Sequence, residues 1–574
     1  MQRFLPFLHW FPGYRMKDVP KDLLAGTTVG IVLVPQAMAY AMIAGLPPVY
    51  GLYAALFPLL IYVLLGTSRP MAIGPVAMDS LLVAIGLGAM ALSDAQYVSM
   101  AIFLALIVGI MQLALGLLRM GYLVNFISKP VINAFTSAAA LIIMMSQLKH
   151  LFGVQVGKSN RFHEMIWFAF QKLSEINFFD LGIGILGIVL IVGLKKWNKK
   201  IPGILLAVVL GTLSVYLLDL ETRGVEIVGS IPSGLPFFEV PEINMDAFAQ
   251  LWPVAITLAL VGYMETVSIG KGIEDKSEED RLDPNQELVA LGTSNIVGSF
   301  FKSYPVAASF SRSYISNEAG ARSNFAGLFA ALLVLATLIF LTPLFYYLPN
   351  AVLASIIMVS VYGLVDIGYS KRLWKLRKDE FAVWIITFLA TLFVGIVEGI
   401  VIGVILALLL MVYRTSKPHI AVLGKIRNSD YYKNVDRFIE DVEQRDDLLI
   451  LRFDAQLYFG NTSYFKNQLF RFIEKNEDGL KAVILNAEAI NYIDSTAAHM
   501  LRKVINEIKS KGVRFYIVGA IGPTRDILFS SGIADIVTKE YLFVRVKEAV
   551  DHFDSIRISS DLSDKVASQR NSKS

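Results

Sequence analysis

One arginine lies in a segment that otherwise suits lipid, residues 303–316, SYPVAASFSRSYIS. Arg312 follows Pro305 by about two helical turns, and Ser311 precedes it directly. A guanidinium presents a fixed fork of donors that fits a tetrahedral oxyanion or a carboxylate. Because ionisable side chains inside a membrane are costly, they usually mark functional sites. We expect Arg312 and Ser311 to face an anion; the alternative is an arginine near a span end that snorkels to the interface.

Two carboxylates are candidates for carrying a coupled cation. Glu265 is the only charged residue between positions 251 and 270, and it could take up and release a proton. It could instead be a fixed partner of Arg312 or Lys271. Asp79 follows Pro75 by four residues, and it could bind a cation or proton or cap a helix.

Two neutral polar residues extend this candidate site. Gln36 and Tyr40 are one helical turn apart and therefore share a face. Amide and hydroxyl donors recognise an anion without binding it too tightly for release. The chain has no cysteine, P-loop, nucleophile motif or metal-ligand cluster, and its six histidines are scattered. We therefore expect no enzyme activity, no cofactor, no metal and no ATP-driven step.

The composition shows what must position these residues. Charged residues make up 17% of the 574 and hydrophobic ones 55%, against about 25% charged in soluble proteins, and the mean hydropathy is +0.57. A helix needs roughly 20 apolar residues to cross the hydrocarbon core. Fourteen apolar segments are expected, at about 22–46, 47–65, 71–92, 97–118, 123–148, 178–194, 201–218, 251–270, 286–300, 304–319, 325–348, 349–368, 379–396 and 398–413.

Basic residues fix the expected orientation. They lie mostly after even-numbered segments, at Arg69, Arg119, 195–200, 271–281, Arg322, 371–378 and 414–417, and the exception is the 149–164 loop. The positive-inside rule then places both termini in the cytoplasm, in a multi-pass protein of the inner or plasma membrane. This topology explains the net charge of +4 without a nucleic-acid partner. The N-terminus lacks the pattern of a cleaved signal peptide.

An internal repeat relates the two halves of the membrane region. Residues 72–82, AIGPVAMDSLL, and 302–312, KSYPVAASFSR, share Pro-Val-Ala at an offset of 230 residues. Each is the third segment of a set of seven, so the second copy enters the membrane with opposite polarity. Inverted repeats of this kind, about 22–218 and 251–413, bring two broken helices together near the midplane, where helix N-termini attract anions. The alternative is that both prolines only kink packed helices.

The chain changes character near residue 415. Short apolar runs at 448–453, 482–486 and 514–519 predict strands, and 491–512 predicts an amphipathic helix, so we expect a small α/β domain over 435–555. Ser495 is expected to be the N-cap of that helix, or a phosphorylation site. Residues 1–21 are expected to be a cytoplasmic segment, 22–415 the transmembrane domain and 556–574 a disordered tail.

Three separated motifs carry a resemblance to a known family. Residues 34–69, VPQAMAYAMIAGLPPVYGLYAALFPLLIYVLLGTSR, 305–327, PVAASFSRSYISNEAGARSNFAG, and 491–501, NYIDSTAAHML, resemble the SulP anion-transporter family with a C-terminal STAS domain. The resemblance implies a 7+7 inverted repeat of 14 membrane segments, a core domain that moves against a gate domain, and a homodimer. It implies an anion site at Gln36, Tyr40, Gly74, Pro75, Val76, Ala77, Ser311 and Arg312.

The chain departs from sodium-coupled bicarbonate members at the eighth segment. Those members carry an aspartate with a threonine one turn later, whereas this chain has Glu265 and Ile269. The pattern is closer to proton-coupled sulfate carriers, so we expect proton-coupled sulfate uptake by elevator-type alternating access, with Glu265 and Asp79 as proton-coupling candidates. The alternatives are a bicarbonate or dicarboxylate carrier on the same scaffold and a membrane-anchored STAS signalling protein. In the STAS loop, DSTA keeps the serine, Ser495, of the DSSG found in phosphorylated relatives.

Overall fold

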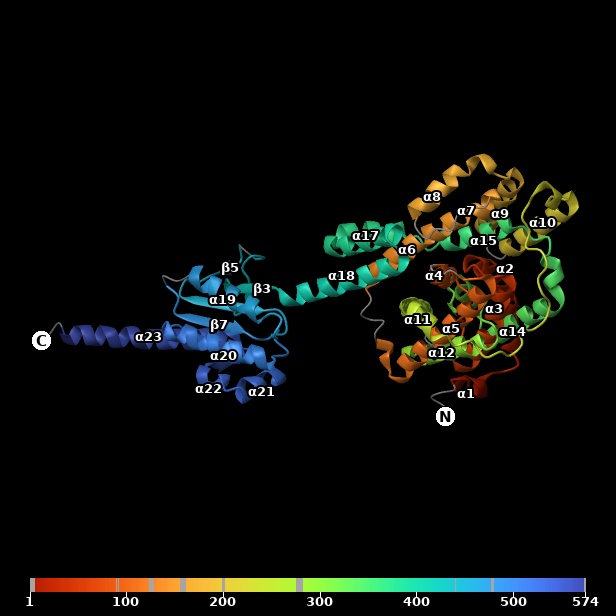
Figure 1. Ribbon diagram of the computed structural model, residues 1–574. Helices are drawn as coiled ribbons and strands as arrows, with labels where there is room; N and C mark the ends of the chain where they lie inside the picture. Colours follow the sequence, from red (N-terminus) through yellow and green to blue (C-terminus); the bar gives the residue numbers. More distant parts are fainter. Residues whose placement is uncertain are drawn as a thin grey trace. The chain divides into compact units, whose positions relative to one another are not determined.

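The computed structural model describes residues 6–88, 90, 92–122, 128–154, 162–198, 202–274, 282–438, 440–475 and 479–571; of His9 and 559–571 only the backbone is described. The chain divides after Ala407 into two compact units, which are taken separately below (Figure 1). Several basic residues used to predict the orientation, at 158, 161, 199–200 and 275–281, lie outside the described residues.

The first unit is helical, because a backbone in lipid must satisfy its own hydrogen bonds. Its first half contains α1 (Phe7–Trp10), α2 (Val19–Ile43), α3 (Pro48–Leu65), α4 (Ala77–Gly88), α5 (Asp94–Leu117), α6 (Lys129–Ser146), α7 (Leu148–Phe152), α8 (Phe162–Gln171), α9 (Phe178–Trp197) and α10 (Gly203–Leu218). Its second half contains α11 (Met245–Glu274), α12 (Pro284–Ser299), α13 (Phe310–Glu318), α14 (Phe325–Ala336), α15 (Asn350–Tyr362), α16 (Ile367–Leu376) and α17 (Lys378–Phe393). Helix α18 (Ile396–Ser416) begins in the first unit and ends in the second.

The predicted apolar segments correspond to these helices. Each of the fourteen overlaps one of them, while α1, α7, α8 and α16 are additional short helices. Within the described residues, nine helices are long and apolar enough to cross a membrane, and α4 and α10 are shorter apolar helices. The polytopic helical fold is thus confirmed, whereas the count of fourteen crossings stays a prediction.

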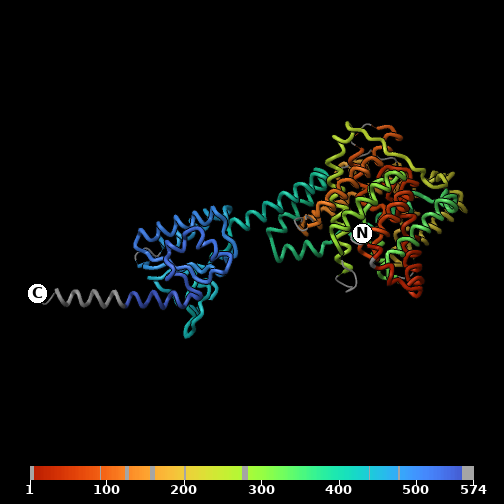
Figure 2. The backbone as a smooth tube through the Cα atoms, turned by 90° about the horizontal axis from the view of Figure 1, so that it is seen from below, coloured from red at the N-terminus to blue at the C-terminus, as the bar shows by residue number. Residues whose placement is uncertain are grey.

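The helices form two packed groups that each draw on both halves of the sequence. In one group α2–α5 pack against α11–α14; in the other α6–α10 pack against α15–α17. Figure 2 shows the red tube of the first half interleaved with the green tube of the second. The groups meet where α2 packs against α10 and α15, and where α4 packs against α6. This arrangement confirms the expected core and gate domains of an inverted repeat.

The two broken segments join at the centre of the first group. Strand β1 (Ile73–Gly74) precedes α4, strand β2 (Ala307–Ala308) precedes α13, and the strands pair antiparallel. The pairing settles the alternative proposed for Pro75 and Pro305: both prolines lie in non-helical connections, rather than at kinks of continuous helices. Each short helix therefore begins inside the unit.

The second unit is an α/β domain around one seven-stranded sheet. The strands run in the order β4-β3-β6-β7-β8-β9, with β5 paired to β3, and β6 to β9 are parallel. Their bounds are β3 (Ile420–Ile426), β4 (Tyr432–Asn434), β5 (Val442–Glu443), β6 (Leu448–Phe453), β7 (Ala482–Asn486), β8 (Arg514–Val518) and β9 (Leu542–Phe543). The helices are α19 (Thr462–Lys475), α20 (Ser495–Ser510), α21 (Gly522–Ser530), α22 (Ile533–Val537) and α23 (Val546–Asn571).

Three details of this unit differ from the sequence-based expectation. The sheet begins at β3, before the predicted boundary at 435, because β3 pairs with β6 in the middle of the sheet. The backbone of α23 continues to Asn571, where a disordered tail was expected from 556; no glycine or proline interrupts this stretch. The N-cap of α20 is Asp494, whose Oδ1 accepts from Ala497 N, and Ser495 is the first helical residue.

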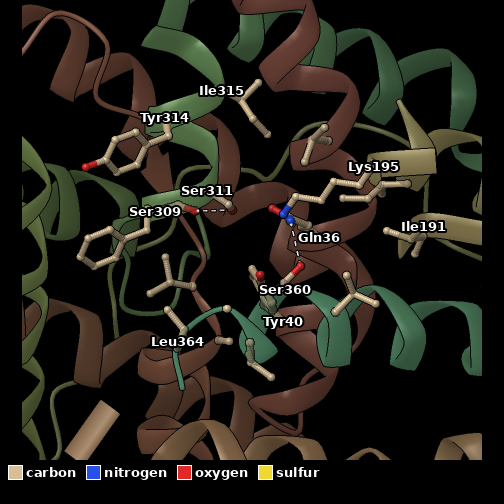
Figure 3. A pocket seen from close by; sticks show the side chains of 18 of the residues that line it. Gln36, Tyr40, Ile191, Lys195, Ser309, Ser311, Tyr314, Ile315, Ser360 and Leu364 are labelled. Atoms are coloured by element: carbon tan, nitrogen blue, oxygen red, sulfur yellow. Dashed lines mark hydrogen bonds between the residues drawn. The ribbon is translucent and has the colours of Figure 1, made fainter. Parts of the chain in front are cut away.

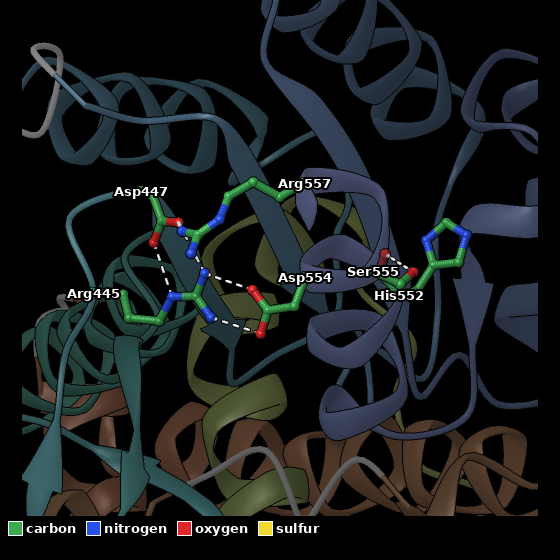
Figure 4. Close-up of polar contacts among 6 residues, drawn as sticks. All are labelled: Arg445, Asp447, His552, Asp554, Ser555 and Arg557. Atoms are coloured by element: carbon green, nitrogen blue, oxygen red, sulfur yellow. Dashed lines mark hydrogen bonds and ion pairs between the residues drawn. The ribbon is translucent and has the colours of Figure 1, made fainter. Parts of the chain in front are cut away.

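Helix α23 is held against the sheet by buried apolar contacts and by ion pairs. Ala549, Val550 and Phe553 are buried against one face of the sheet. Beside them Arg445 donates to Asp554 at 2.7 and 2.9 Å and to Asp447 at 2.8 Å (Figure 4). Arg557 adds a bond of 2.7 Å to Asp447. Hydrogen bonds from Arg445 lower the pKa of Asp447.

We predict that Arg445→Ala loosens the start of α23, because it removes the bonds to Asp554 and leaves only the bond from Arg557 to Asp447. The expected loss is about 1 kcal/mol, since the guanidinium is partly exposed and screened. Hydrogen exchange of residues 546–558 in the full chain should accelerate, whereas exchange after the matched change Arg514→Ala should stay as in the wild type. Because the pKa of Asp447 is lowered, the bridge stabilises above the ordinary carboxyl pKa of about 3.9 and is lost as pH falls further. Unchanged exchange would contradict this role.

Candidate functional site

A cavity of about 510 Å³ lies where the two helix groups of the first unit meet. Its lining comes from α2, α4, α11 and α13 of one group and from α9, α10 and α15 of the other (Figure 3). The predicted site residues that line it are Gln36, Tyr40, Val76, Ala77, Glu265 and Ser311. Residues distant in sequence are thus brought together at one place.

One face of α2 forms a wall of the cavity. Thr28, Val32, Gln36 and Tyr40 follow one another at intervals of four residues and all line it. Residues four apart lie on the same side of a helix, so the shared face predicted for Gln36 and Tyr40 is longer than expected. Three of these four side chains carry a hydroxyl or an amide, and Val32 is apolar.

Two helix N-termini reach the cavity from opposite copies of the repeat. Val76, Ala77 and Met78 line it at the start of α4, and Ser309, Phe310 and Ser311 line it at the start of α13. First-turn N–H groups have no partner within the helix, and the positive end of the helix dipole lies there. Ser309 is the N-cap of α13, and its Oγ lies 3.4 Å from that of Ser311 (Figure 3). The arrangement suits a small anion.

Buried hydrogen bonds hold the two broken segments in register. The backbone N of Ala72 donates to Ser313 Oγ at 3.0 Å, and Ser309 N donates to Ala72 O at 3.0 Å. Asn295 holds Val306 on both sides: its Oδ1 accepts from Val306 N at 2.9 Å and its Nδ2 donates to Val306 O at 3.1 Å. These bonds satisfy backbone groups that the breaks in the helices leave open.

Arg312 lies behind the cavity lining, which differs from its expected place. Its side chain is 0% exposed, and its fork donates to Gln36 Oε1 at 3.3 Å and to Pro75 O at 2.8 Å. Gly74 and Pro75 are also absent from the lining. Among the described residues no carboxylate lies within 4 Å of the guanidinium, so neither the snorkelling alternative nor a fixed pair with Glu265 holds. The arginine orients Gln36 and places an uncompensated positive charge behind the two helix N-termini.

The two candidate carboxylates lie together on one side of the site. Glu265 lines the cavity, whereas Asp79 is 2% exposed and does not. They are close enough for their charges to interact. Asp79 lies next to Gly262, which is one turn before Glu265 on α11, because its Oδ2 would be 3.4 Å from a Cβ built on that glycine. Asp79 Oδ1 has no partner among the described residues.

Two residues of the second helix group were missed by sequence reasoning. Ser360 on α15 accepts from Gln36 Nε2 at 3.3 Å, and so bridges the two groups (Figure 3). Lys195 was assigned to a basic loop, but α9 continues to Trp197 and the lysine lines the cavity. Its spacing of one turn from Ile191, which also lines the cavity, is a signal that could have identified it. A single serine in an apolar helix gives no such signal.

The remaining predictions lie elsewhere. Ser495 is exposed at the first residue of α20, in the second unit, and a regulatory role for it stays a prediction. Within the described residues there is no group of three histidine, aspartate or glutamate side chains that could hold a metal ion.

Family comparisons agree with this geometry. The model of the sulfate permease family matches residues 19–387, and that of the STAS domain matches residues 441–551. The chain is 37% identical over 582 residues to sulfate transporter 4.1, chloroplastic, of Arabidopsis thaliana, an alignment that covers 98% of this chain and 84% of the relative. The chain therefore belongs to the sulfate permease family, and it is a multi-pass membrane protein with a C-terminal STAS domain.

Solved structures show the same architecture. Murine solute carrier 26 family member A9, an anion transporter in the inward-facing state, is 27% identical with a TM-score of 0.88, covering 96% of this chain and 94% of that one. The transmembrane domain of a cyanobacterium bicarbonate transporter, BicA, is 21% identical with a TM-score of 0.59. It covers 69% of this chain and 98% of that one, and at this identity it shows the fold alone.

We predict that Asn295→Ala lowers the thermal stability of the purified protein. The change leaves the N–H and C=O of Val306 without their partner in a buried place, at about 1–3 kcal/mol for each group. Thr293→Ala, on the same helix, removes only a bond from Oγ1 to Val289 O and serves as the control. Melting curves of the two variants in detergent should differ clearly, and equal melting temperatures would show that Asn295 does not hold the second broken segment.

Proposed function

We propose that this protein moves a small inorganic anion, most favourably sulfate, by proton-coupled secondary active transport. The observation that carries the proposal is the convergence of two helix N-termini and the charge of Arg312 on one cavity between two helix groups. The name of the Arabidopsis relative, a sulfate transporter, supports sulfate as the substrate. No enzymatic step is part of the proposal.

The donors at the cavity favour recognition that is reversible. Backbone N–H groups at two helix starts, the hydroxyls of Ser309 and Ser311 and the amide of Gln36 are neutral donors. The full charge of Arg312 acts from behind the lining, so the anion makes no direct ion pair with it. Gln36, Tyr40 and the first turns of α4 and α13 would contact the anion. Lys195, from α9 of the other helix group, would attract it.

The position of the cavity favours alternating access by an elevator-type movement. One wall belongs to α2, α4, α11 and α13, and the other to α9, α10 and α15. A displacement of the first group against the second would carry the anion-binding residues past α15 and break the bond between Gln36 and Ser360. The murine structural relative is named as inward-facing, which supports a cycle with more than one state.

Energy considerations require a coupled cation. Each negative charge entering a negative-inside compartment is opposed by about 2.3 kcal/mol per 100 mV. Glu265 borders the cavity and lies beside Asp79, so a proton taken up there would reduce repulsion toward an incoming anion. Proton and anion would then favour each other's binding.

The other expectations remain part of the same proposal. Basic loops favour a cytoplasmic location for both termini and the STAS domain, and we propose a homodimer in the inner or plasma membrane.

A bicarbonate or dicarboxylate carrier on the same fold is the second candidate, because the likeness to BicA shows fold but not substrate. A membrane-anchored signalling protein would not need a cavity built from both repeats. Uptake of labelled sulfate, bicarbonate and fumarate into proteoliposomes distinguishes these candidates.

We predict that Arg312→Ala abolishes anion uptake in proteoliposomes, because it removes the positive charge and frees Gln36. Arg312→Lys should restore only part of the uptake, since it keeps the charge but cannot bond Gln36 and Pro75 with a planar fork. Arg372→Ala, at an exposed arginine of α16 outside the cavity, is the control. Wild-type uptake by a well-folded Arg312→Ala protein would refute the role assigned to this residue.

We predict that Glu265→Gln uncouples transport from protons. The amide mimics the protonated carboxyl, so the variant should still bind and exchange anion but lose accumulation driven by a pH gradient. Exchange and gradient-driven uptake should be measured in the same vesicles, with Glu318→Gln, another cavity-lining glutamate, as the matched control. Sodium-dependent uptake that is insensitive to pH in the wild type would count against Glu265 and leave Asp79 as the cation-binding candidate.

A further inference from the structure

A second pocket, of about 720 Å³, lies at the start of the first unit and is separate from the anion cavity. It is formed by the segment before α2, by the connection from α3 to β1 and by the connection from α13 to α14. The residues that line it are Trp10, Gly13, Tyr14, Arg15, Lys17, Asp18, Lys21, Arg69, Arg322 and Ser323. None of them lines the first cavity.

The charge of this pocket is strongly positive. Five cations and one carboxylate line it, so the net charge of the lining is +4. Within the described part of the chain, no carboxylate lies within 4 Å of the charged groups of Arg15, Lys17, Lys21 or Arg322. Asp18, the only acidic residue of the lining, accepts from the backbone N of Arg15 at 3.3 Å. Like charges gathered around one concavity create a positive potential that attracts an anion.

Buried contacts give the pocket a fixed shape. Asp22, behind the lining, is 0% exposed; it accepts from Arg322 N at 2.6 Å, from Ser323 N at 3.2 Å and from Ser323 Oγ at 2.5 Å. Its carboxylate is therefore used to hold the connection between α13 and α14. The rings of Trp10 and Tyr14 meet Phe325 edge-on, with centroids 5.0 and 4.9 Å apart. The cations are thus presented on an ordered frame.

The surroundings of the pocket indicate where its ligand comes from. Phe11, Met16, Leu23 and Leu24 flank the cations in sequence and are 52%, 86%, 48% and 62% exposed. Apolar side chains beside a cationic pocket, at the ends of membrane-spanning helices, match the boundary between lipid tails and headgroups. A soluble anion would need the cations but not the apolar border.

We propose that this pocket binds a phosphate group, and that the phosphate belongs to the headgroup of an anionic phospholipid. The guanidinium groups of Arg15 and Arg322 are suited to bidentate contact with phosphate oxygens, and the two lysines act as point charges. The indole N–H of Trp10, which has no partner among the described residues, is an additional donor in the lining. The acyl chains would lie along Leu23 and Leu24. The site lies outside the transport cavity, so its occupancy is independent of the proposed function.

The test uses the purified full-length protein in neutral detergent and measures binding by titration calorimetry. Three probes are compared: short-chain phosphatidylglycerol, short-chain phosphatidylcholine and inorganic phosphate. The pocket variant carries Arg15→Gln, Lys17→Gln and Lys21→Gln. The control carries Lys371→Gln, Arg372→Gln and Lys375→Gln, which removes the same charge from exposed positions on α16.

We expect phosphatidylglycerol to bind the wild type and the α16 control equally, and the pocket variant at least about tenfold more weakly. Binding should also weaken as salt is raised, because it is electrostatic. Equal binding by the pocket and α16 variants would overturn the site. Binding of inorganic phosphate as tight as that of phosphatidylglycerol, lost in the pocket variant, would overturn the lipid source but retain the phosphate site. Equal binding of phosphatidylcholine would overturn recognition of negative charge.

If the triple variant does not fold, Lys17→Gln and Lys21→Gln are titrated singly, and each should weaken binding severalfold.

Discussion

The antiparallel pairing of Ile73–Gly74 with Ala307–Ala308 is the contact on which the first unit depends. Two helices that stop inside an apolar unit leave backbone N–H and C=O groups that lipid cannot satisfy. The pairing and Ser313 satisfy groups of the first segment with partners from the other half of the chain, and Asn295 satisfies Val306 from within the second half. The same pairing places the N-termini of α4 and α13 at one cavity. The element that satisfies the backbone groups therefore also forms the anion site that we propose.

The second constraint is the absence of a counterion for Arg312. A buried guanidinium usually needs a carboxylate, yet its described partners are the amide oxygen of Gln36 and the carbonyl of Pro75. Its charge remains uncompensated when the cavity holds no anion. Glu265 and Asp79 lie near each other and not in an ion pair with it, so opposite charges are kept apart across the site. In the proposed mechanism, this separation would let different residues hold the anion and the proton.

Much of the fold and of the candidate site could be predicted from the sequence, because a helix that crosses lipid must be apolar over most of its length. Apolar length located the helices, the Pro-Val-Ala repeat located the two broken segments, and a four-residue spacing placed Gln36 with Tyr40. Burial of Arg312 behind the lining could not be predicted, because a sequence motif names a residue but not the direction of its side chain. Ser360 could not be found, since its partner lies 324 residues away. The start of the second unit was placed too late because β3 follows an apolar helix directly and gives only a short strand pattern.

The long sequence separation of these contacts also constrains how the protein is made. Ala72 N finds its acceptor on Ser313, and Pro75 O finds its donor on Arg312, 241 and 237 residues later. Until that part of the chain emerges from the ribosome, the first broken segment has no partner for these groups. A nascent first repeat therefore waits in an incomplete state, and the cavity forms only after synthesis has passed the middle of the chain. Misassembly is therefore most favoured in the interval between synthesis of the first repeat and synthesis of the second.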